Sequence, residues 1–369
     1  MSCQDDGYEQ LSMIGWTQRL SELFQAQFGD QVMPGRVTRV DRGLYTVMTN
    51  LCEQAARITG AFEYRIAALE EYPVVGDWVA VSEVDEPAAP LRVSGCMARS
   101  SAVRRRDSGE AALAQVLAAN VDLVLITFSL DGGRRCNPRA AERYATIAWE
   151  SGAVPVILLN KTDIAANVEQ SAAEISAAAP GVELILSSGV TGAGLAELRR
   201  LLARHKTAVL IGPSGSGKST LVNALAGSQL LRVGKLRKGD LRGRHTTVAR
   251  QLVPVQGGGA IIDTPGLREL QPWAAREALD ASFSDVAEIA AGCRYGDCTH
   301  TVEPGCAVQA ALADGALEFA RFANYLELVK EDEGTVLKSA EQARREREER
   351  WKKIHQQARG FTKERRAGG

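Results

Sequence analysis

The chain has 369 residues, of which 44 are Lys or Arg and 45 are Asp or Glu, for a formal net charge of −1. This length exceeds that of one ordinary domain, so two or three domains are expected. The near-zero charge excludes nucleic-acid binding through overall charge and leaves only local basic surface for such contacts. The N-terminus is acidic, with Asp5, Asp6 and Glu9, and no apolar run reaches membrane-spanning length. We therefore expect a cytoplasmic protein without membrane contact.

The first hundred residues divide into a helical extension and an all-β unit. In residues 1–33, apolar side chains recur at helical spacing from Leu20 to Phe28, which predicts a short amphipathic helix before Gly29. Residues 34–100 contain short alternating runs separated by turn residues, the pattern of half-buried strands. Their length suits a five-stranded barrel of the oligonucleotide-binding (OB) type.

Three arginines at the start of the β unit have two interpretations. Arg36, Arg39 and Arg42 could follow the phosphate backbone of a bound nucleic acid. A solvated barrel face would explain them equally well. The sequence does not separate the two.

Residues 101–275 show an alternation of strands and helices. Arg104 to Gly109 are interpreted as a polar linker that precedes this alternation. Buried strands are expected at 121–128, 154–159, 184–186, 208–211, 252–255 and 260–263, and helices at 138–151, 168–178, 195–202 and 221–226. Such an alternation predicts a mostly parallel sheet with helices on both faces. The fold class is therefore multidomain, with an OB-type barrel followed by an α/β domain.

A phosphate-binding loop lies in the second half of the α/β region and consists of Gly212, Pro213, Ser214, Gly215, Ser216, Gly217, Lys218, Ser219 and Thr220. It follows an apolar strand and opens onto a helix, the context that this P-loop motif requires. Its glycines let the backbone turn its N–H groups toward a polyphosphate, and the helix N-terminus adds partial positive charge. Lys218 would reach the β- and γ-phosphates, and the Ser219 hydroxyl would bind Mg²⁺.

A guanine-specificity box directly follows the strand at 154–159 and consists of Asn160, Lys161, Thr162 and Asp163. The Asp163 carboxylate would accept hydrogen bonds from the guanine N1–H and the exocyclic amino group. Adenine lacks this donor pattern and would leave a buried carboxylate unpaired, which costs several kcal/mol. Ser187 and Ser188, with the following Gly189, also come after a strand and could supply a backbone N–H to the guanine carbonyl oxygen.

Two further segments complete a GTP site. Asp263 begins an Asp-Thr-Pro-Gly sequence in which it would hold Mg²⁺ through water, and the Gly266 N–H would meet the γ-phosphate. A second Mg²⁺ hydroxyl should come from Thr247 or its neighbour Thr246, and Thr247 is favoured. The GTP-binding set is therefore spread over four loops.

The order of these motifs predicts the connectivity of the domain. The guanine-specific segments precede the phosphate loop, whereas they follow it in Ras-like proteins, so the domain is circularly permuted. Permutation at a surface loop leaves the site intact. It also joins the γ-phosphate sensor directly to the C-terminal region, where nucleotide-driven movement is expected to be transmitted.

A compact set of potential metal ligands lies in the C-terminal region, at Cys293, Cys298, His300 and Cys306. Three thiolates and one imidazole supply a closed tetrahedral Cys₃His site with no open position for water, which favours one structural Zn²⁺. Ordinary reduced thiols are the alternative interpretation. An odd total of seven Cys argues against a disulfide framework.

With these motifs, the sequence resembles the ribosome small-subunit-dependent GTPase A family from about residue 34 onward. The marks of resemblance are the permuted order, the Gly-Arg-His-Thr-Thr run at 243–247, the Asp-Thr-Pro-Gly run at 263–266 and the Cys/His run at 293–306. The resemblance implies an OB barrel at 34–100, a permuted GTPase domain at 101–275 and a zinc-binding helical domain at 276–369. It also implies GTP hydrolysis to GDP stimulated by the small ribosomal subunit, a role in late subunit maturation, and binding of small-subunit rRNA. We expect a monomer.

Two features concern how the protein would act. Leu267 stands where Ras-like enzymes carry the glutamine that orients water, so His245 in the switch loop is our candidate catalytic group. A histidine that only contacts the partner is the alternative. The C-terminal stretch 338–366 holds eleven Lys or Arg and five Glu, a net charge of +6. It could contact phosphates through its end at 363–366, or form a solvated helix supported by i, i+4 ion pairs.

Two other functional classes remain in view. The phosphate loop also resembles that of ABC-type transport ATPases, but no Leu-Ser-Gly-Gly-Gln signature follows it and the guanine box would be unexplained. The third possibility is an RNA-binding module in which the GTPase fold is only a scaffold. Nucleotide preference and turnover distinguish the three.

Overall fold

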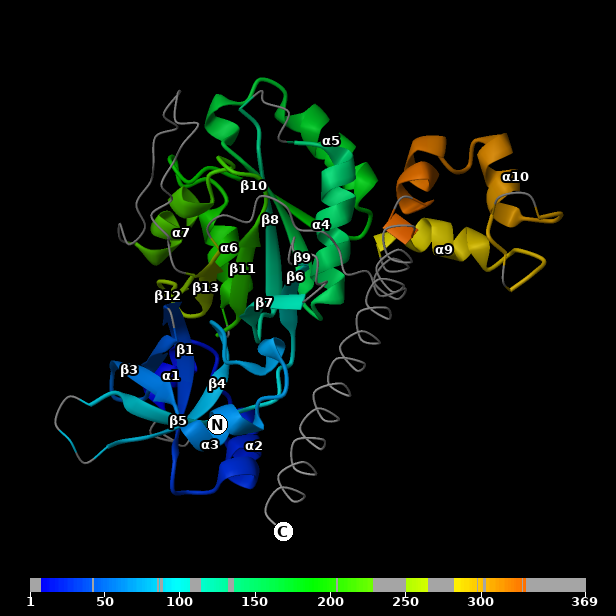
Figure 1. Ribbon diagram of the computed structural model, residues 1–369. Coiled ribbons are helices and arrows are strands. Elements are labelled where there is room, and N and C mark those ends of the chain that lie inside the picture. The colour runs from blue at the N-terminus through cyan, green and yellow to red at the C-terminus, as the bar shows by residue number, and fades with distance from the viewer. Residues whose placement is uncertain are drawn as a thin grey trace, which may run out of the picture.

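The computed structural model describes residues 8–41, 43–84, 86, 89–106, 114–131, 136–203, 205–227, 250–264, 282–296, 298–300, 303–326 and 328–329. Figure 1 shows the barrel strands below an α/β domain, with a small helical region beside helices α4 and α5 of that domain. This arrangement confirms the multidomain fold class predicted from the sequence. The exact domain boundaries stay predictions.

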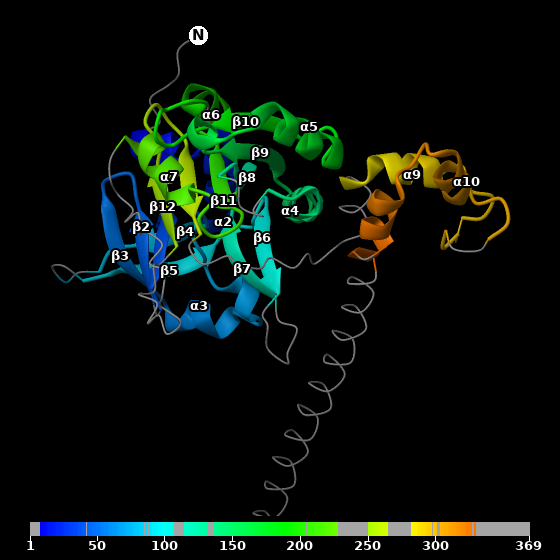
Figure 2. The same ribbon diagram turned by 90° about the horizontal axis from the view of Figure 1, so that it is seen from above.

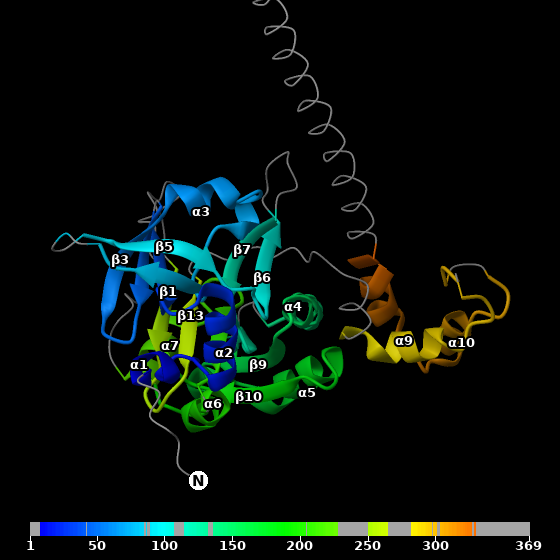
Figure 3. The same cartoon turned by 90° about the horizontal axis from the view of Figure 1, so that it is seen from below.

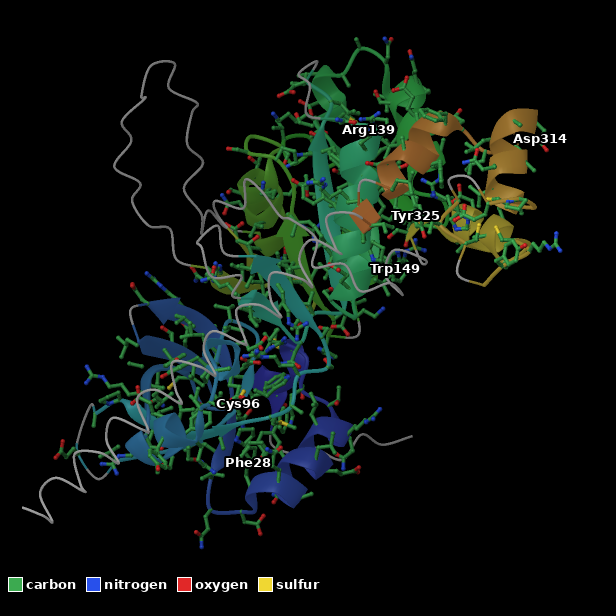
Figure 4. The ribbon with its side chains drawn as sticks, turned by 45° about the vertical axis from the view of Figure 1, so that its right-hand side comes forward. Phe28, Cys96, Arg139, Trp149, Asp314 and Tyr325 are labelled. Atoms are coloured by element: carbon green, nitrogen blue, oxygen red, sulfur yellow. The ribbon has the colours of Figure 1, made fainter. Side chains whose placement is uncertain are left out.

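Two short helices precede the barrel, α1 (Glu9–Met13) and α2 (Gln18–Phe28), where the sequence predicted one. The hydroxyl of Thr17 caps α2 by accepting a hydrogen bond from the Leu20 N–H at 3.3 Å. Figure 3 shows both helices from below, next to barrel and sheet strands. Phe28 packs against Gly95 of the barrel, and Figure 4 shows Phe28 near Cys96. The extension is therefore part of the packed body.

Five strands close the barrel: β1 (Met33–Asp41), β2 (Leu44–Met48), β3 (Glu53–Ile58), β4 (Trp78–Ser82) and β5 (Leu91–Cys96). Their spatial order is β1-β2-β3-β5-β4, and an additional β1–β4 pairing joins the two ends. Helix α3 (Gly60–Arg65) and the 3₁₀ turn η1 (Leu69–Glu71) connect β3 to β4. This is the strand order of an OB barrel, as predicted. Alternate side chains fill its interior, Val37, Val47, Val79 and Val93 among them.

Arg36 of β1 is buried, contrary to both interpretations of the arginines at the start of the barrel. The side chain is 1% exposed, and its guanidinium donates to the carbonyl oxygens of Ile14, Gly76 (3.2 Å) and Asn120 (3.1 Å). It also stacks over the ring of Trp78, 4.7 Å from the centroid. Burial lowers the pKa of Arg36 to about 10, which still leaves it charged near neutral pH.

The partners of Arg36 come from three parts of the chain. Ile14 follows helix α1, Gly76 lies in the loop before β4, and Asn120 ends the segment that leads into the α/β domain. Arg36 therefore ties the N-terminal extension and the barrel to the α/β domain. Arg39 is the exposed member of the group and pairs with Asp41 at 3.4 Å. Arg42 lies outside the described residues.

A hairpin stands where the sequence predicted a polar linker. Strand β6 (Ala102–Arg106) contains Arg104 and pairs antiparallel with β7 (Ala114–Ala119). Ala102 and Val103 are buried and Val116 and Leu117 cover the same hairpin, so apolar packing at its base fixes the strands. Arg104 is exposed and lies 4.0 Å from the Glu70 carboxylate. The linker prediction for Arg104 to Arg106 is therefore wrong, and residues 107–109 lie outside the described residues.

The α/β domain is built on parallel strands β8 (Leu123–Ser129), β9 (Val154–Asn160), β10 (Glu183–Ser187), β11 (Thr207–Ile211) and β13 (Ala260–Asp263), with β12 (Gln251–Pro254) antiparallel. The spatial order is β10-β9-β8-β11-β13-β12. Intervening helices are α4 (Pro138–Glu150), α5 (Val168–Ala178), α6 (Leu195–Leu202) and α7 (Lys218–Ala226), with a 3₁₀ turn η2 (Thr162–Ile164). These elements follow the predicted pattern closely.

Successive side chains of the strands pack on opposite faces of the sheet. Val124 and Ile126 pack in the cluster that contains α4 and α5, whereas Leu123 and Leu125 pack in the cluster that contains α6 and α7. Figure 2 shows the two helix pairs on the domain viewed from above. The sheet also continues into the barrel, because Arg39 of β1 pairs with Gln251 of β12. Barrel and nucleotide domain therefore share one eleven-stranded sheet.

The C-terminal region contains α9 (Ser284–Ala290), α10 (Ala307–Asp314) and helical residues 319–326. Arg321 fastens this region to the α/β domain. It pairs with Asp285 of α9 at 2.5 Å and with the buried Glu142 of α4 at 2.7 Å, and donates to the Ala178 carbonyl at 2.8 Å. Figure 4 shows the helix that carries Tyr325 beside α4, on which Arg139 and Trp149 are labelled. The basic stretch 338–366 lies outside the described residues.

The burial of Arg36 predicts a large loss of stability on substitution. Arg36→Met removes the donors from three buried or part-buried carbonyls and should lower the free energy of unfolding by about 3 kcal/mol or more. Arg39→Met, which breaks only an exposed ion pair, should change it by less than about 0.5 kcal/mol. Urea unfolding followed by tryptophan fluorescence measures both, because Trp16 and Trp78 lie at the junction. Equal midpoints for the two variants would contradict the assignment.

Candidate nucleotide-binding site

The phosphate loop connects the fully buried strand β11 to helix α7. Gly212 (φ 131°) and Gly217 (φ 94°) have left-handed backbone conformations. A Cβ at Gly212 would overlap the Thr127 carbonyl, and one at Gly217 would overlap the Asn160 amide. Only glycine satisfies both the conformation and the space at these positions. The intervening Pro213, Ser214, Gly215 and Ser216 form the turn, and Ser219 and Thr220 lie in the first turn of α7.

The Lys218 ammonium is held by its own loop. Nζ donates to the carbonyl oxygens of Gly212 at 2.7 Å and Pro213 at 2.8 Å. Burial lowers the pKa of Lys218 to about 8, an effect that the negative charge of Asp263 opposes. Near neutral pH the Lys218 side chain therefore keeps its positive charge although it is partly shielded from solvent. A polyphosphate entering the loop would offer this cation stronger partners than the two carbonyls.

Asn160 and Lys161 join the guanine box to the phosphate loop. The Asn160 side-chain amide donates to the Ser216 carbonyl at 2.8 Å, and the Lys161 ammonium donates to the Gly215 carbonyl at 2.8 Å. Lys161 has a left-handed backbone (φ 67°) between β9 and η2, which is uncommon for a residue with a side chain. These bonded residues are 56 and 54 positions apart in the chain, so the two motifs form one site.

Asp163 is oriented by the loop after β10. The Ser188 hydroxyl donates to the Asp163 carboxylate at 2.5 Å, and the Thr162 hydroxyl donates to the Ser187 carbonyl at 3.2 Å. The Gly189 N–H points to the Asn160 side-chain oxygen at 3.4 Å. Ser188 thus acts on the carboxylate that would read the base, and the Gly189 N–H is directed to the guanine box itself.

Gly189 is closely packed against helix α7. A Cβ there would lie 3.0 Å from Thr220 Cγ2 and 3.2 Å from the Leu221 nitrogen. A side chain at Gly189 would therefore press on the helix that follows the phosphate loop. This contact holds the base-binding loop against the phosphate-binding element.

Asp263 ends strand β13 beside the phosphate loop. It pairs in register with Leu210 of β11 and is 3% exposed. Desolvation raises its pKa, while the Lys218 charge lowers it. The adjacent Thr264 donates to the Leu210 carbonyl at 2.7 Å, a role that no sequence motif indicated. Gly266, His245, Thr246 and Thr247 lie outside the described residues, so their predicted roles stay predictions.

The four predicted metal ligands are brought together in the C-terminal region. Cys293, Cys298, His300 and Cys306 place their ligand atoms within 4.8 Å of one another. His300 Nδ1 lies 3.5 Å from Cys293 Sγ and 3.6 Å from Cys306 Sγ, and the two sulfurs are 3.9 Å apart. A tetrahedral ion with metal–sulfur bonds of about 2.3 Å requires edges of about 3.5 to 3.8 Å. The donor set therefore fits one tetrahedral metal ion.

The surroundings of the cluster fix its ligands. His300 and Cys306 are each 6% exposed, and Cys306 also caps helix α10 by accepting from the Gln309 N–H. The Gln309 side chain donates to the His300 carbonyl at 2.6 Å. Cys293, Cys298 and Cys306 adjoin the apolar cluster built on Phe283 and Phe322. A bound metal ion would therefore add to the stability that this small apolar cluster gives the region.

This geometry defines the class of protein. The guanine-specificity box precedes the P-loop in the chain, and the two are held together at the carboxyl edge of one sheet. This is the site of a circularly permuted P-loop GTPase.

Comparison with known proteins places the chain within that class. A model of the RsgA GTPase family matches residues 96–273. The small ribosomal subunit biogenesis GTPase RsgA of Syntrophotalea carbinolica is 37% identical over 362 residues, covering 96% of this chain and 98% of the relative. The protein of the same name from Opitutus terrae is 38% identical, covering 94% of this chain and 96% of the relative. The chain therefore belongs to the RsgA GTPase family and is a GTP hydrolase.

Solved structures show the same fold. YjeQ from Thermotoga maritima superposes with a TM-score of 0.62 at 23% identity, covering 82% of this chain and 99% of that one. YloQ, described as a circularly permuted GTPase, superposes with a TM-score of 0.58 at 22% identity, covering 84% and 97%. The permuted connectivity predicted from the motif order is thus confirmed. Among the described helices, none combines the length and hydropathy needed to cross a bilayer.

Proposed function

We propose that this GTPase acts in the biogenesis of the small ribosomal subunit, binding the subunit and its rRNA and hydrolysing GTP to GDP and phosphate when the subunit stimulates it. The proposal that this site binds GTP rests on the hydrogen bonds from Asn160 and Lys161 to the phosphate loop. The names of the relatives, which span nearly the whole chain, support the ribosomal part.

The proposed GTP contacts divide between the two ends of the nucleotide. Asp163, oriented by Ser188, would accept from the guanine N1–H and amino group. Backbone N–H groups of the phosphate loop and the Lys218 ammonium would hold the phosphates. Hydroxyls of Ser219 and Thr247, with Asp263 through water, would hold the Mg²⁺ that neutralises phosphate charge during the reaction.

Hydrolysis is proposed to depend on the partner. Leu267 has no group that orients water, so the free enzyme should be slow. His245, in the switch segment next to the Mg²⁺ threonines, would orient the attacking water when the subunit is bound. The slow basal rate makes GTP hydrolysis a signal of correct subunit binding.

The rRNA contacts are assigned to local basic surface, because the net charge is −1. The burial of Arg36 removes it from this role. Arg39 on the exposed barrel face and the basic end at 363–366 remain candidates. We propose that the protein works as a cytoplasmic monomer.

We propose that the Cys₃His cluster holds one structural Zn²⁺. The supporting observation is the match between its sulfur and nitrogen spacings and a tetrahedral site. All four positions are taken by protein ligands, which leaves the ion a structural role. It would fix the segment between α9 and α10, whose neighbour Arg321 contacts helix α4 of the GTPase domain.

Turnover with and without purified small ribosomal subunits tests the proposed function. GTP hydrolysis by the wild-type chain should rise about a hundredfold or more with subunits, and ATP hydrolysis should stay near background. His245→Ala should keep GTP affinity and lose about a hundredfold of the stimulated rate. A preference for ATP would support the ABC-type alternative, and subunit binding without turnover would support the scaffold alternative. Undiminished stimulation of His245→Ala would exclude that residue as the catalytic group.

Metal analysis of the purified chain tests the zinc proposal. We expect one zinc per chain, with Cys306→Ser losing it because three ligands hold the ion less tightly than four. Cys136→Ser removes a half-buried thiol that is not among the four ligands and should keep full zinc. Proteolysis of the region after α9 should quicken in Cys306→Ser. Zinc-free wild-type protein with the same proteolytic stability would refute the site.

A further inference from the structure

Asp131 lies beside the guanine box and has no role in the motifs described above. Its Oδ2 accepts a hydrogen bond from the Lys161 ammonium at 2.7 Å, while the same ammonium donates to the Gly215 carbonyl at 2.8 Å. The Lys161 ammonium is therefore held at two points, one on the phosphate loop and one on the loop that follows strand β8. No spacing rule in the sequence links residue 131 to residue 161.

The backbone places this carboxylate accurately. Asp131 comes two residues after the end of β8, whose last residue, Ser129, pairs with Asn160 in the parallel sheet. The next bond, from the Leu130 N–H to the Asn160 carbonyl at 3.0 Å, continues this register beyond the strand. Asp131 thus projects from a segment that is fixed to the guanine box itself.

The ion pair differs from an ordinary surface pair. The Lys161 and Asp131 side chains are 26% and 22% exposed, so water screens them less than it screens the Arg39–Asp41 pair at 47% and 57%. The Lys161 stem also runs across the phosphate loop, with Cε 3.8 Å from the position that a Cβ on Gly217 would take. Its methylene groups are therefore held at the mouth of the nucleotide site.

A free lysine side chain loses much rotamer entropy when a ligand immobilises it. Here the two contacts hold Lys161 before any nucleotide binds, which lowers the cost of binding. The effect concerns the guanine box and the phosphate loop, the parts of the proposed site that GDP and GTP share. It should therefore change affinity for both nucleotides equally and leave the chemical step alone.

We propose that Asp131 is a positioning residue for guanine-nucleotide binding, acting through Lys161. The inference rests on the proposed use of this site for GTP. Asp131→Ala should weaken GDP and GTP binding about tenfold, equivalent to about 1.4 kcal/mol. The KM for GTP should rise by the same factor while kcat at saturation is unchanged. Asp131→Asn, which keeps an acceptor oxygen but loses the charge, should fall between wild type and Asp131→Ala.

A double-mutant cycle separates positioning through Lys161 from a general structural effect. GDP dissociation constants are measured by calorimetry for wild type, Asp131→Ala, Lys161→Ala and the double variant. If Asp131 acts through Lys161, the double variant should bind GDP as weakly as Lys161→Ala alone. Asp41→Ala, which removes the carboxylate of an exposed ion pair on the barrel, should bind GDP as wild type does.

Three results would overturn the proposal: additive losses in the double variant, unchanged GDP affinity of both Asp131 variants, or a fall in kcat that matches the fall in kcat/KM. Titrations of the wild-type protein with GDP and ADP distinguish failure of this proposal from failure of the proposed function. If ADP binds as well as GDP, the guanine assignment is wrong, and the coupling between Asp131 and Lys161 can still be measured with either nucleotide.

Discussion

The hydrogen bond from the Asn160 amide to the Ser216 carbonyl is the contact on which the nucleotide site depends. It joins two loops that come from different strands and are separated by 56 positions in the chain. Because Asn160 is 2% exposed, loss of this bond would leave a buried polar group unpaired, at a cost of about 1–3 kcal/mol. It also explains the glycine at 217, since the amide occupies the space of any side chain there. Base recognition and phosphate binding are therefore geometrically a single unit.

Permutation changes what this unit is connected to. Strand β13 ends at Asp263, and its partner β12 pairs with β1 of the barrel. Arg36 ties the same barrel strand to the segment that enters β8. Arg321 connects the Cys/His region to helix α4. The C-terminal region thus contacts the helix before β9 and the guanine box, and the barrel contacts β12, which pairs with the strand that ends at Asp263. These contacts give a physical route from partner binding to the site.

Local patterns in the sequence predict most of this architecture. Apolar strands followed by the two nucleotide motifs fix the α/β order, because each motif has a required strand and helix context. The Cys/His spacing likewise predicts the cluster that the structure brings together. Where prediction failed, the deciding contacts were distant in sequence. Arg36 follows a strand pattern that suggests exposure, yet its carbonyl partners lie at 14, 76 and 120. The hairpin at β6 depends on packing by β7, and Asp131 meets Lys161 only through the pairing of two strands.

The central claim is that Asp163 reads the guanine base in a site completed by the phosphate loop. The most direct measurement is the affinity of Asp163→Asn for GDP and for xanthosine diphosphate. Xanthine carries a carbonyl where guanine carries its amino group, so the asparagine amide can donate where the aspartate could only accept. The account predicts that wild type prefers GDP and that the variant reverses this preference, with GDP binding weakened roughly a hundredfold or more. A variant that still bound GDP more tightly than xanthosine diphosphate would contradict it.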